Sequence, residues 1–163
     1  MPQTVLGKEK WQDWGRRCLW PAGRVYAAAM RARTGLYASG VLGCWRPPSP
    51  CVSVGNISVG GSGKTPLAEW ILQSAAKRGK RPALLSRGYK ACPPYYPYLV
   101  RPDTRAAEAG DEPAMLARSC REAMVVIDYR RDRGGRWIWE RSRPDLFVLD
   151  DGMQHLRVQR DLD

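Results

Sequence analysis

The chain has 163 residues and a formal net charge of +11, from 27 Lys and Arg against 16 Asp and Glu. This length is enough for one domain with a buried core, and no run of about 18 apolar residues predicts a membrane-spanning helix. The N-terminus lacks the compact apolar run and cleavage site of a signal peptide, and the basic charge indicates an anionic partner.

Cysteine and histidine usage argues against a disulfide framework or a zinc site. The five cysteines are odd in number, none forms a C-x-x-C pair, and the chain has one histidine. These features fit a reducing cytosol best.

The N-terminal region, residues 1–40, is expected to hold an amphipathic helix over residues 16–37. At 100° per residue, Arg17, Arg24 and Arg31 fall on one narrow stripe and mostly apolar residues fill the other side. Tryptophan and arginine around an apolar face are typical of a helix at a membrane interface. An ordinary helix that packs on the domain, with its arginines in solvent, explains the same pattern.

Charge concentrates at this end, because residues 1–50 hold eight Lys or Arg against two Asp or Glu, a net of +6. Residues 41–50 are rich in Gly and Pro and are interpreted as a linker. The domain that follows is expected to span residues 51–163.

A phosphate-binding loop is the most specific motif of the chain. It comprises Ser58, Val59, Gly60, Gly61, Ser62, Gly63, Lys64 and Thr65. Backbone N–H groups of such a loop surround a phosphate chain, while its lysine reaches the outer phosphates and its hydroxyl holds Mg²⁺. The strict motif begins with Gly where this chain has Ser58. The flanks, a β-prone run at 51–54 and a helical pattern at 67–78, are the context that such a loop requires.

Further along, apolar runs predict strands at 81–86, 124–127 and 146–149, and a helix is expected to begin at 110–113. Residues 91–98 and 130–136 are interpreted as loops, the second a charged one at the surface. In the first, three prolines and three tyrosines lie beside basic residues, so stacking on bases and packing on the sheet both remain open. Strands that alternate with helices predict an α/β domain with a mostly parallel sheet.

Asp150 and Asp151 directly follow the last predicted strand. An acidic residue at this place lies beside a phosphate loop and holds Mg²⁺ directly or through water. A solvated Asp-Asp-Gly turn is the alternative.

Several sequence blocks occur together in one order. They are Val-Gly-Asn-Ile-Ser-Val-Gly-Gly-Ser-Gly-Lys-Thr-Pro at 54–66, Ser-Arg-Gly-Tyr at 86–89, Gly-Asp-Glu-Pro at 110–113, Leu-Asp-Asp-Gly-Met-Gln-His at 149–155 and Arg-Asp-Leu-Asp at 160–163. In these blocks, from about residue 16 to the last residue, the chain resembles the tetraacyldisaccharide 4′-kinase family, whose loop also has Ser or Thr at the position of Ser58. The resemblance implies transfer of the γ-phosphate of ATP to the 4′-hydroxyl of an acylated glucosamine disaccharide. It also implies work at the cytosolic face of the bacterial inner membrane, and it favours the membrane interpretation of residues 16–37.

The resemblance also implies roles for single residues. Lys64 and the loop would bind the β- and γ-phosphates of ATP, and Thr65 with Asp150 or Asp151 would hold Mg²⁺. Asp111, with Glu112 nearby, would help to deprotonate the sugar hydroxyl. Arg87 and His155 would lie on the substrate side.

Two features depart from the family pattern. Met153 stands where the family usually has Phe. The family is roughly twice as long and places its active site between two lobes, so this chain is expected to be an N-terminal lobe. Such a lobe alone would bind Mg²⁺·ATP weakly and transfer phosphate poorly or not at all. Whether a partner chain supplies the second lobe stays open.

Two other classes of function compete with a lipid kinase. A phosphate-loop ATPase or nucleotide-binding module acting on a protein partner is the runner-up. A GTPase is disfavoured because Asn56, the only asparagine, cannot form the guanine-reading motif. The charge alone suggests nucleic acid, but the chain has no recognised reading motif, so no nucleic-acid partner is expected.

Overall fold

The computed structural model describes residues 21, 23–37, 39–55, 63–152 and 155–163, and the chain divides into two compact units, Met1–Gly43 and Cys44–Asp163. In the first unit a helix covers residues 23–37, as predicted, while Arg17 and the start of the predicted helix lie outside the described residues. Its apolar side chains Val25 and Tyr26 are 71% and 68% exposed. Among the described residues, no helix has the length and apolar character needed to cross a membrane.

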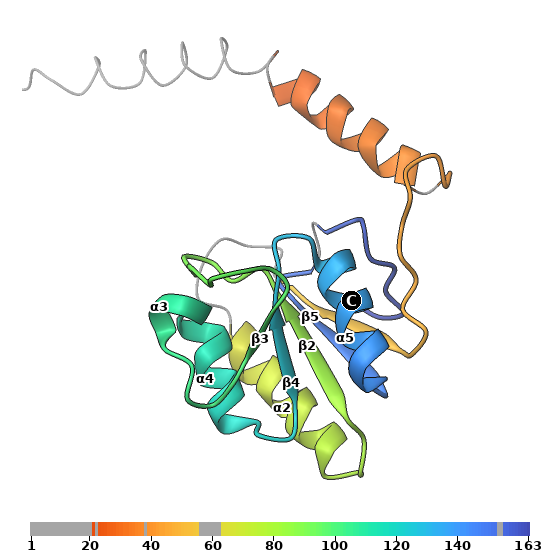
Figure 1. Ribbon diagram of the computed structural model, residues 1–163. Coiled ribbons are helices and arrows are strands. Elements are labelled where there is room, and N and C mark those ends of the chain that lie inside the picture. The colour runs from red at the N-terminus through yellow and green to blue at the C-terminus, as the bar shows by residue number, and fades with distance from the viewer. Residues whose placement is uncertain (1–20, 22, 38, 56–62, 153–154) are drawn as a thin grey trace, which may run out of the picture. The chain divides into compact units, whose positions relative to one another are not determined.

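The second unit is a five-stranded sheet with helices on both faces (Figure 1). Its elements in chain order are β1 (Cys51–Val54), α2 (Lys64–Ala76), β2 (Pro82–Ser86), β3 (Tyr98–Val100), α3 (Ala106–Ala109), α4 (Asp111–Ser119), β4 (Met124–Ile127), α5 (Arg131–Ser142) and β5 (Leu146–Asp150). The strand order is β1-β5-β2-β4-β3. In this order, neighbouring strands from β1 through β4 pair in parallel, and β3 pairs antiparallel with β4. The predicted mostly parallel α/β fold is confirmed.

Alternating strand residues form a separate core on each face of the sheet. Leu84 and Val148 pack with α2 and α4 on one face, whereas Leu85 and Phe147 pack with Ile138 of α5 on the other. The central strands are covered on both sides, which explains why β2 and β5 read as continuous apolar runs.

Trp45, within the segment that the sequence suggested as a linker, is 7% exposed and packs edge-on against Phe147 with ring centroids 5.4 Å apart.

Two predicted loops contain regular structure. The tyrosine-rich loop gives way at Tyr98 to β3, whose three residues complete the sheet. The prediction of a surface loop at 130–136 is wrong, because α5 begins at Arg131 and continues to Ser142.

Close packing explains why two consecutive glycines are part of α5. Gly134 lies so near the sheet that a Cβ there would be 3.1 Å from the Cβ of Asp128, and a Cβ on Gly135 would overlap the Trp45 ring. Glycine costs roughly 1 kcal/mol in a helix interior. Here it allows the helix to approach the sheet, so α5 depends on tertiary contacts more than on its own sequence.

The last residues of the chain pair with the outer edge of β1. The Asp161 N–H donates to the Cys51 carbonyl at 2.8 Å and the Ser53 N–H to the Leu162 carbonyl at 2.8 Å. The Asp161 carboxylate accepts the Cys51 N–H at 2.8 Å. This segment therefore satisfies edge groups of β1.

Candidate nucleotide site

The carboxyl ends of β1, β2, β4 and β5 lie at the upper edge of the sheet in Figure 1. They bring together most of those predicted site residues that the structure describes. Lys64 is the first residue of α2 and follows Gly63, whose φ of 69° lies in the left-handed region that glycine adopts without strain. Thr65 is the second residue of α2 and is half-buried. The predicted loop residues 58–62 lie outside the described residues.

A tight turn after β5 carries the two aspartates. Asp150 is the last residue of the strand and is 7% exposed. Asp151 has a φ of 49°, an uncommon conformation for a residue other than glycine. Gly152 completes the turn, and a Cβ there would come within 2.7 Å of Ser53 Oγ. The turn directs Asp151 toward α2, where its Oδ1 is 3.1 Å from Lys64 Nζ.

Ser86, at the end of β2, holds the other aspartate. Its hydroxyl donates to Asp150 Oδ2 at 3.0 Å in a buried hydrogen bond, and its carbonyl accepts the N–H of Asp128 at 3.0 Å. One residue thus links the ends of three adjacent strands.

The Gly-Asp-Glu-Pro block begins α4 at the same edge. Gly110 has a φ of 84°, and a Cβ there would lie 2.9 Å from the Tyr89 carbonyl. Only glycine fits this approach, and it joins the block to the Ser-Arg-Gly-Tyr segment. Asp111 and Glu112 then fall in the first turn of α4, where the helix dipole stabilises negative charge.

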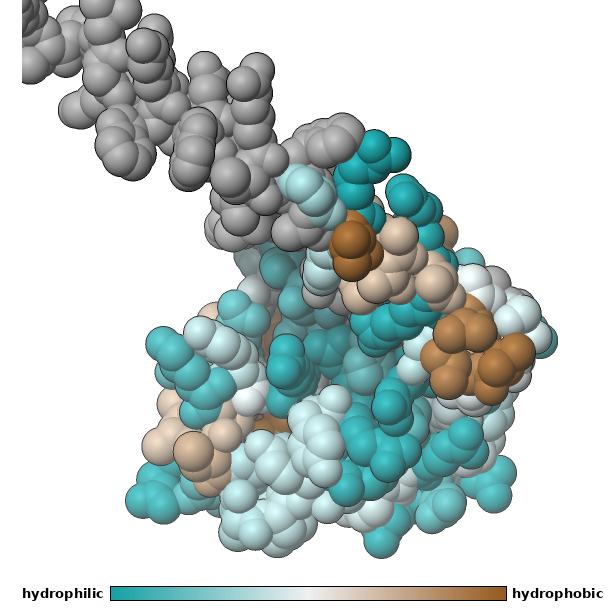
Figure 2. Space-filling view, turned by 90° about the horizontal axis from the view of Figure 1, so that it is seen from above, coloured by the Kyte–Doolittle hydropathy of each residue, from teal (hydrophilic) through white to brown (hydrophobic). Residues whose placement is uncertain are grey.

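These elements line one cavity of about 580 Å³. Four basic and four acidic side chains, among the described residues, line it: Lys64, Arg87, Lys90 and Arg131, with Asp111, Glu112, Asp150 and Asp151. Figure 2, viewed from this edge, shows hydrophilic residues over much of the surface that is not drawn in grey. Every predicted site residue within the described part of the chain lines this cavity, except Gly63, Thr65 and His155.

Burial changes the acidity of two carboxyls in the cavity. Burial raises the pKa of Asp150, while the hydrogen bond from Ser86 and the charge of Arg131 lower it less. Burial also raises the pKa of Glu112, as does the nearby charge of Asp150. Both groups are therefore easier to protonate than exposed carboxyls.

Arg131 is a site residue that the sequence interpretation missed. It is 5% exposed, and its Nη1 donates to the Asp151 carbonyl at 3.0 Å. Burial lowers its pKa, and the charges of Asp150 and Asp151 oppose that effect. No local pattern distinguished Arg131 from the other arginines of a charged stretch, because its burial depends on α5.

His155 lies in a smaller neighbouring cavity of about 300 Å³. The two cavities share three lining residues, Arg87, Arg131 and Asp151. The predicted substrate-side pair, Arg87 and His155, is therefore brought together beside the larger cavity.

A mostly parallel α/β sheet with a lysine at the start of the helix after β1, and an aspartate pair at the end of the neighbouring strand, is the arrangement of the phosphate-loop kinase fold. The sequence model of the family described as tetraacyldisaccharide-1-P 4'-kinase matches residues 15–163. The chain belongs to this family.

Relatives and a solved structure agree with this membership. The tetraacyldisaccharide 4'-kinases of Oleidesulfovibrio alaskensis and Nitratidesulfovibrio vulgaris are 56% and 53% identical over 143 residues, which cover 88% of this chain and 40% of each relative. That of Tolumonas auensis is 36% identical over the whole chain and 49% of its own length. The chain thus spans less than half the length of these curated relatives.

The solved structure is that of LpxK from Aquifex aeolicus, an "apo" form in complex with ATP. It is 37% identical to this chain and has a TM-score of 0.74, covering 90% of this chain and 47% of its own. The resemblance inferred from the sequence blocks is confirmed. The alternative, a phosphate-loop ATPase or nucleotide-binding module that acts on a protein partner, is not favoured.

Proposed function

We propose that this chain forms the nucleotide-binding part of a kinase that transfers the γ-phosphate of ATP to the 4′-hydroxyl of a tetraacylated glucosamine disaccharide 1-phosphate. One observation carries the proposal. Lys64, the Asp150–Asp151 turn and the Asp111–Glu112 pair line a single cavity at the carboxyl edge of a parallel sheet. Family membership and the ATP bound in the Aquifex aeolicus structure support the same nucleotide.

In this proposal Lys64 binds the outer phosphates of ATP. Its ammonium lies 3.1 Å from the Asp151 carboxylate, so it already contacts an anionic oxygen like those of a phosphate. The N-terminus of α2 adds N–H groups and partial positive charge. The loop residues 58–63 would complete the phosphate contacts.

The donors at this edge fit Mg²⁺. No group of three or more His, Cys, Asp or Glu within the described residues is placed to hold a metal, but kinase Mg²⁺ takes one or two carboxylates together with phosphates and water. Asp150, Asp151 and the Thr65 hydroxyl supply hard oxygen ligands of that kind. Bound Mg²⁺ would neutralise charge that develops on the transferred phosphoryl group.

For the acceptor we propose Asp111 as the group that takes the proton of the sugar hydroxyl, with Glu112 beside it. Both line the same cavity as the nucleotide residues, but they belong to a different element, α4. Arg87 and His155 would contact the acceptor from the adjoining cavity. We further propose that residues outside these 163, on the same or a partner chain, complete the acceptor site.

The acceptor carries four acyl chains, so we propose that the protein works at a membrane surface, the cytoplasmic face of the bacterial inner membrane. The exposed Val25 and Tyr26 and the arginines of the helix at residues 23–37 support contact with anionic lipid.

Nucleotide binding by the Lys64→Ala variant tests the proposal. Loss of a charge-assisted contact costs about 1.5–3 kcal/mol, so the dissociation constant of Mg²⁺·ATP is expected to rise at least about 10-fold. Isothermal titration calorimetry measures it. Lys77→Ala is the matched control, because Lys77 is exposed at the opposite end of α2.

Equal affinities of wild type and Lys64→Ala would contradict the proposal. A phosphate-loop ATPase is distinguished by its product. It releases inorganic phosphate from ATP, whereas the kinase places labelled phosphate on the disaccharide when the unmatched part of the Oleidesulfovibrio alaskensis relative is supplied.

A further inference from the structure

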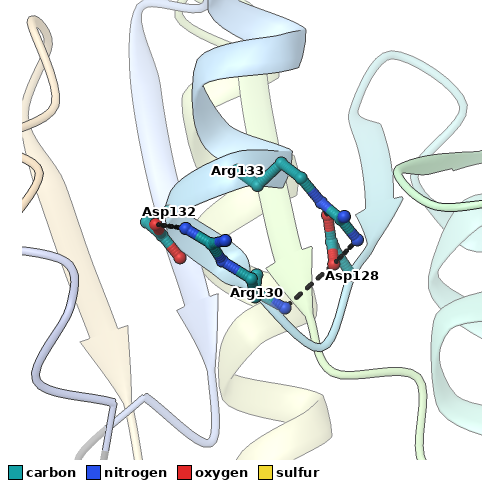
Figure 3. Close-up of polar contacts among 4 residues, drawn as sticks. All are labelled: Asp128, Arg130, Asp132 and Arg133. Atoms are coloured by element: carbon teal, nitrogen blue, oxygen red, sulfur yellow. Dashed lines mark hydrogen bonds and ion pairs between the residues drawn. The ribbon is translucent and has the colours of Figure 1, made fainter.

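Four charged residues between β4 and the first turns of α5 form a cluster with no role in the function proposed above. They are Asp128, Arg130, Asp132 and Arg133 (Figure 3). Asp128 is only 1% exposed and lies directly after β4. A buried carboxylate is stable only when it is paired and hydrogen-bonded, so its partners indicate what it holds in place.

Asp128 has partners on both sides of Arg131. Its Oδ1 accepts the backbone N–H of Arg130 at 2.9 Å. Its two oxygens accept Nε and Nη2 of Arg133, each at 2.8 Å, in a bidentate pair. Figure 3 shows the Arg133 guanidinium, which comes from α5, facing the Asp128 carboxylate at the end of β4.

Asp128 is itself tied to the floor of the nucleotide site. Its N–H donates to the carbonyl of Ser86, whose hydroxyl donates to Asp150. Asp128 thus fixes the backbone before Arg131 and the helical turn after it to the end of β2. The same end of β2 holds Asp150, a proposed Mg²⁺ ligand.

Arg131 is the side chain that this arrangement delivers to the site. Its Nη1 donates to the Asp151 carbonyl, and its buried Nε has no hydrogen-bond partner among the described residues. Arg131 lines both cavities. A buried arginine with an unused donor beside two aspartates needs a fixed backbone, since a shift of about 1 Å would break its contacts.

We propose that Asp128 is a positioning residue for nucleotide binding, which acts by holding the backbone on both sides of Arg131 so that the guanidinium orients the Asp150–Asp151 turn. This inference rests on the proposed function. It assigns to Asp128 no contact with the nucleotide, so its effect must pass through Arg131.

A double-mutant cycle tests that dependence. Asp128→Asn and Arg131→Gln are each expected to raise the dissociation constant of Mg²⁺·ATP about 10-fold, and the double variant no more than Arg131→Gln alone. Arg130→Ala is the matched control. It removes the side-chain pair with Asp132 but keeps the backbone N–H that Asp128 accepts, so wild-type affinity is expected.

A spectroscopic readout separates positioning from general destabilisation. In ¹⁵N-resolved NMR spectra, the buried Arg131 Nε–H is expected to give a signal whose proton exchanges slowly with solvent. Arg131→Lys should remove this signal. In Asp128→Asn the signal should shift and exchange faster, while far-UV circular dichroism stays that of a folded chain. Arg133→Lys, which keeps the charge but loses the bidentate geometry, should show the same change to a smaller extent.

Additive effects in the cycle, or an unchanged Arg131 signal in Asp128→Asn, would overturn the proposal. A wild-type chain that binds no Mg²⁺·ATP would instead overturn the proposed function. The NMR comparison would still decide whether Asp128 orients Arg131.

Discussion

At the scale of single residues, Asp150 combines burial with a proposed role as an anion. Its exposed fraction is 7%, and that burial raises the pKa of its carboxyl. Mg²⁺ binds the carboxylate and not the neutral acid. Protonation of Asp150 therefore competes with the metal, and it does so at higher pH than at an exposed aspartate.

We expect the affinity for Mg²⁺·ATP to weaken on acidification, in a range above that where an exposed aspartate titrates. Ser86→Ala removes a hydrogen bond that lowers the pKa of Asp150, so the decline should move to still higher pH. Dissociation constants measured across the acidic range test this. An identical decline in Asp150→Asn would show that another group is responsible.

The residues that sequence reasoning found and missed differ in how they are encoded. Lys64, Asp111 and Asp151 are marked by neighbours in the chain, such as glycines and strand ends, so a local pattern predicts them. Arg131 donates to the carbonyl of Asp151, and the backbone N–H of Asp128 donates to Ser86 at the end of β2. These partners lie far from either residue in the sequence, so no local pattern contains them.

At the scale of elements, the same distinction separates β5 from α5. An apolar run predicts β5, because a central strand is covered on both faces and its residues are therefore apolar on both sides. In α5 the sequence at 131–136 has four charged residues and two glycines. It becomes helical because the glycines fit against Asp128 and Trp45, which only the folded chain brings together.

Gly135→Ala should therefore destabilise the fold although alanine favours helices. Overpacking against Trp45 is expected to lower the free energy of unfolding by about 1–3 kcal/mol. Thermal and urea unfolding measure the change. Gly43→Ala is the control, because nothing lies within 4 Å of a Cβ there. Adding Trp45→Phe should restore part of the loss, and an unchanged or raised stability in Gly135→Ala would contradict this packing.

At the scale of the whole molecule, two compact units correspond to two proposed tasks, membrane contact and nucleotide binding. Each basic residue near an anionic surface contributes about 1 kcal/mol. The triple variant Arg17/Arg24/Arg31→Glu should therefore bind anionic vesicles at least about 100-fold more weakly, by cosedimentation. Its affinity for Mg²⁺·ATP should not change.

Vesicle binding that survives the triple substitution would favour a helix packed on protein. Retention of the wild-type chain on DNA would point to the nucleic-acid interpretation instead.

The pairing of Asp161 and Leu162 with β1 also affects how the sheet presents its edges. An open strand edge is a template for edge-to-edge aggregation, and natural sheets keep such edges short or covered. Here the β1 edge is occupied by the chain's own backbone, and the opposite edge is β3, only three residues long. Within the described residues, both margins of the sheet are thus poor templates for edge-to-edge pairing with a second copy.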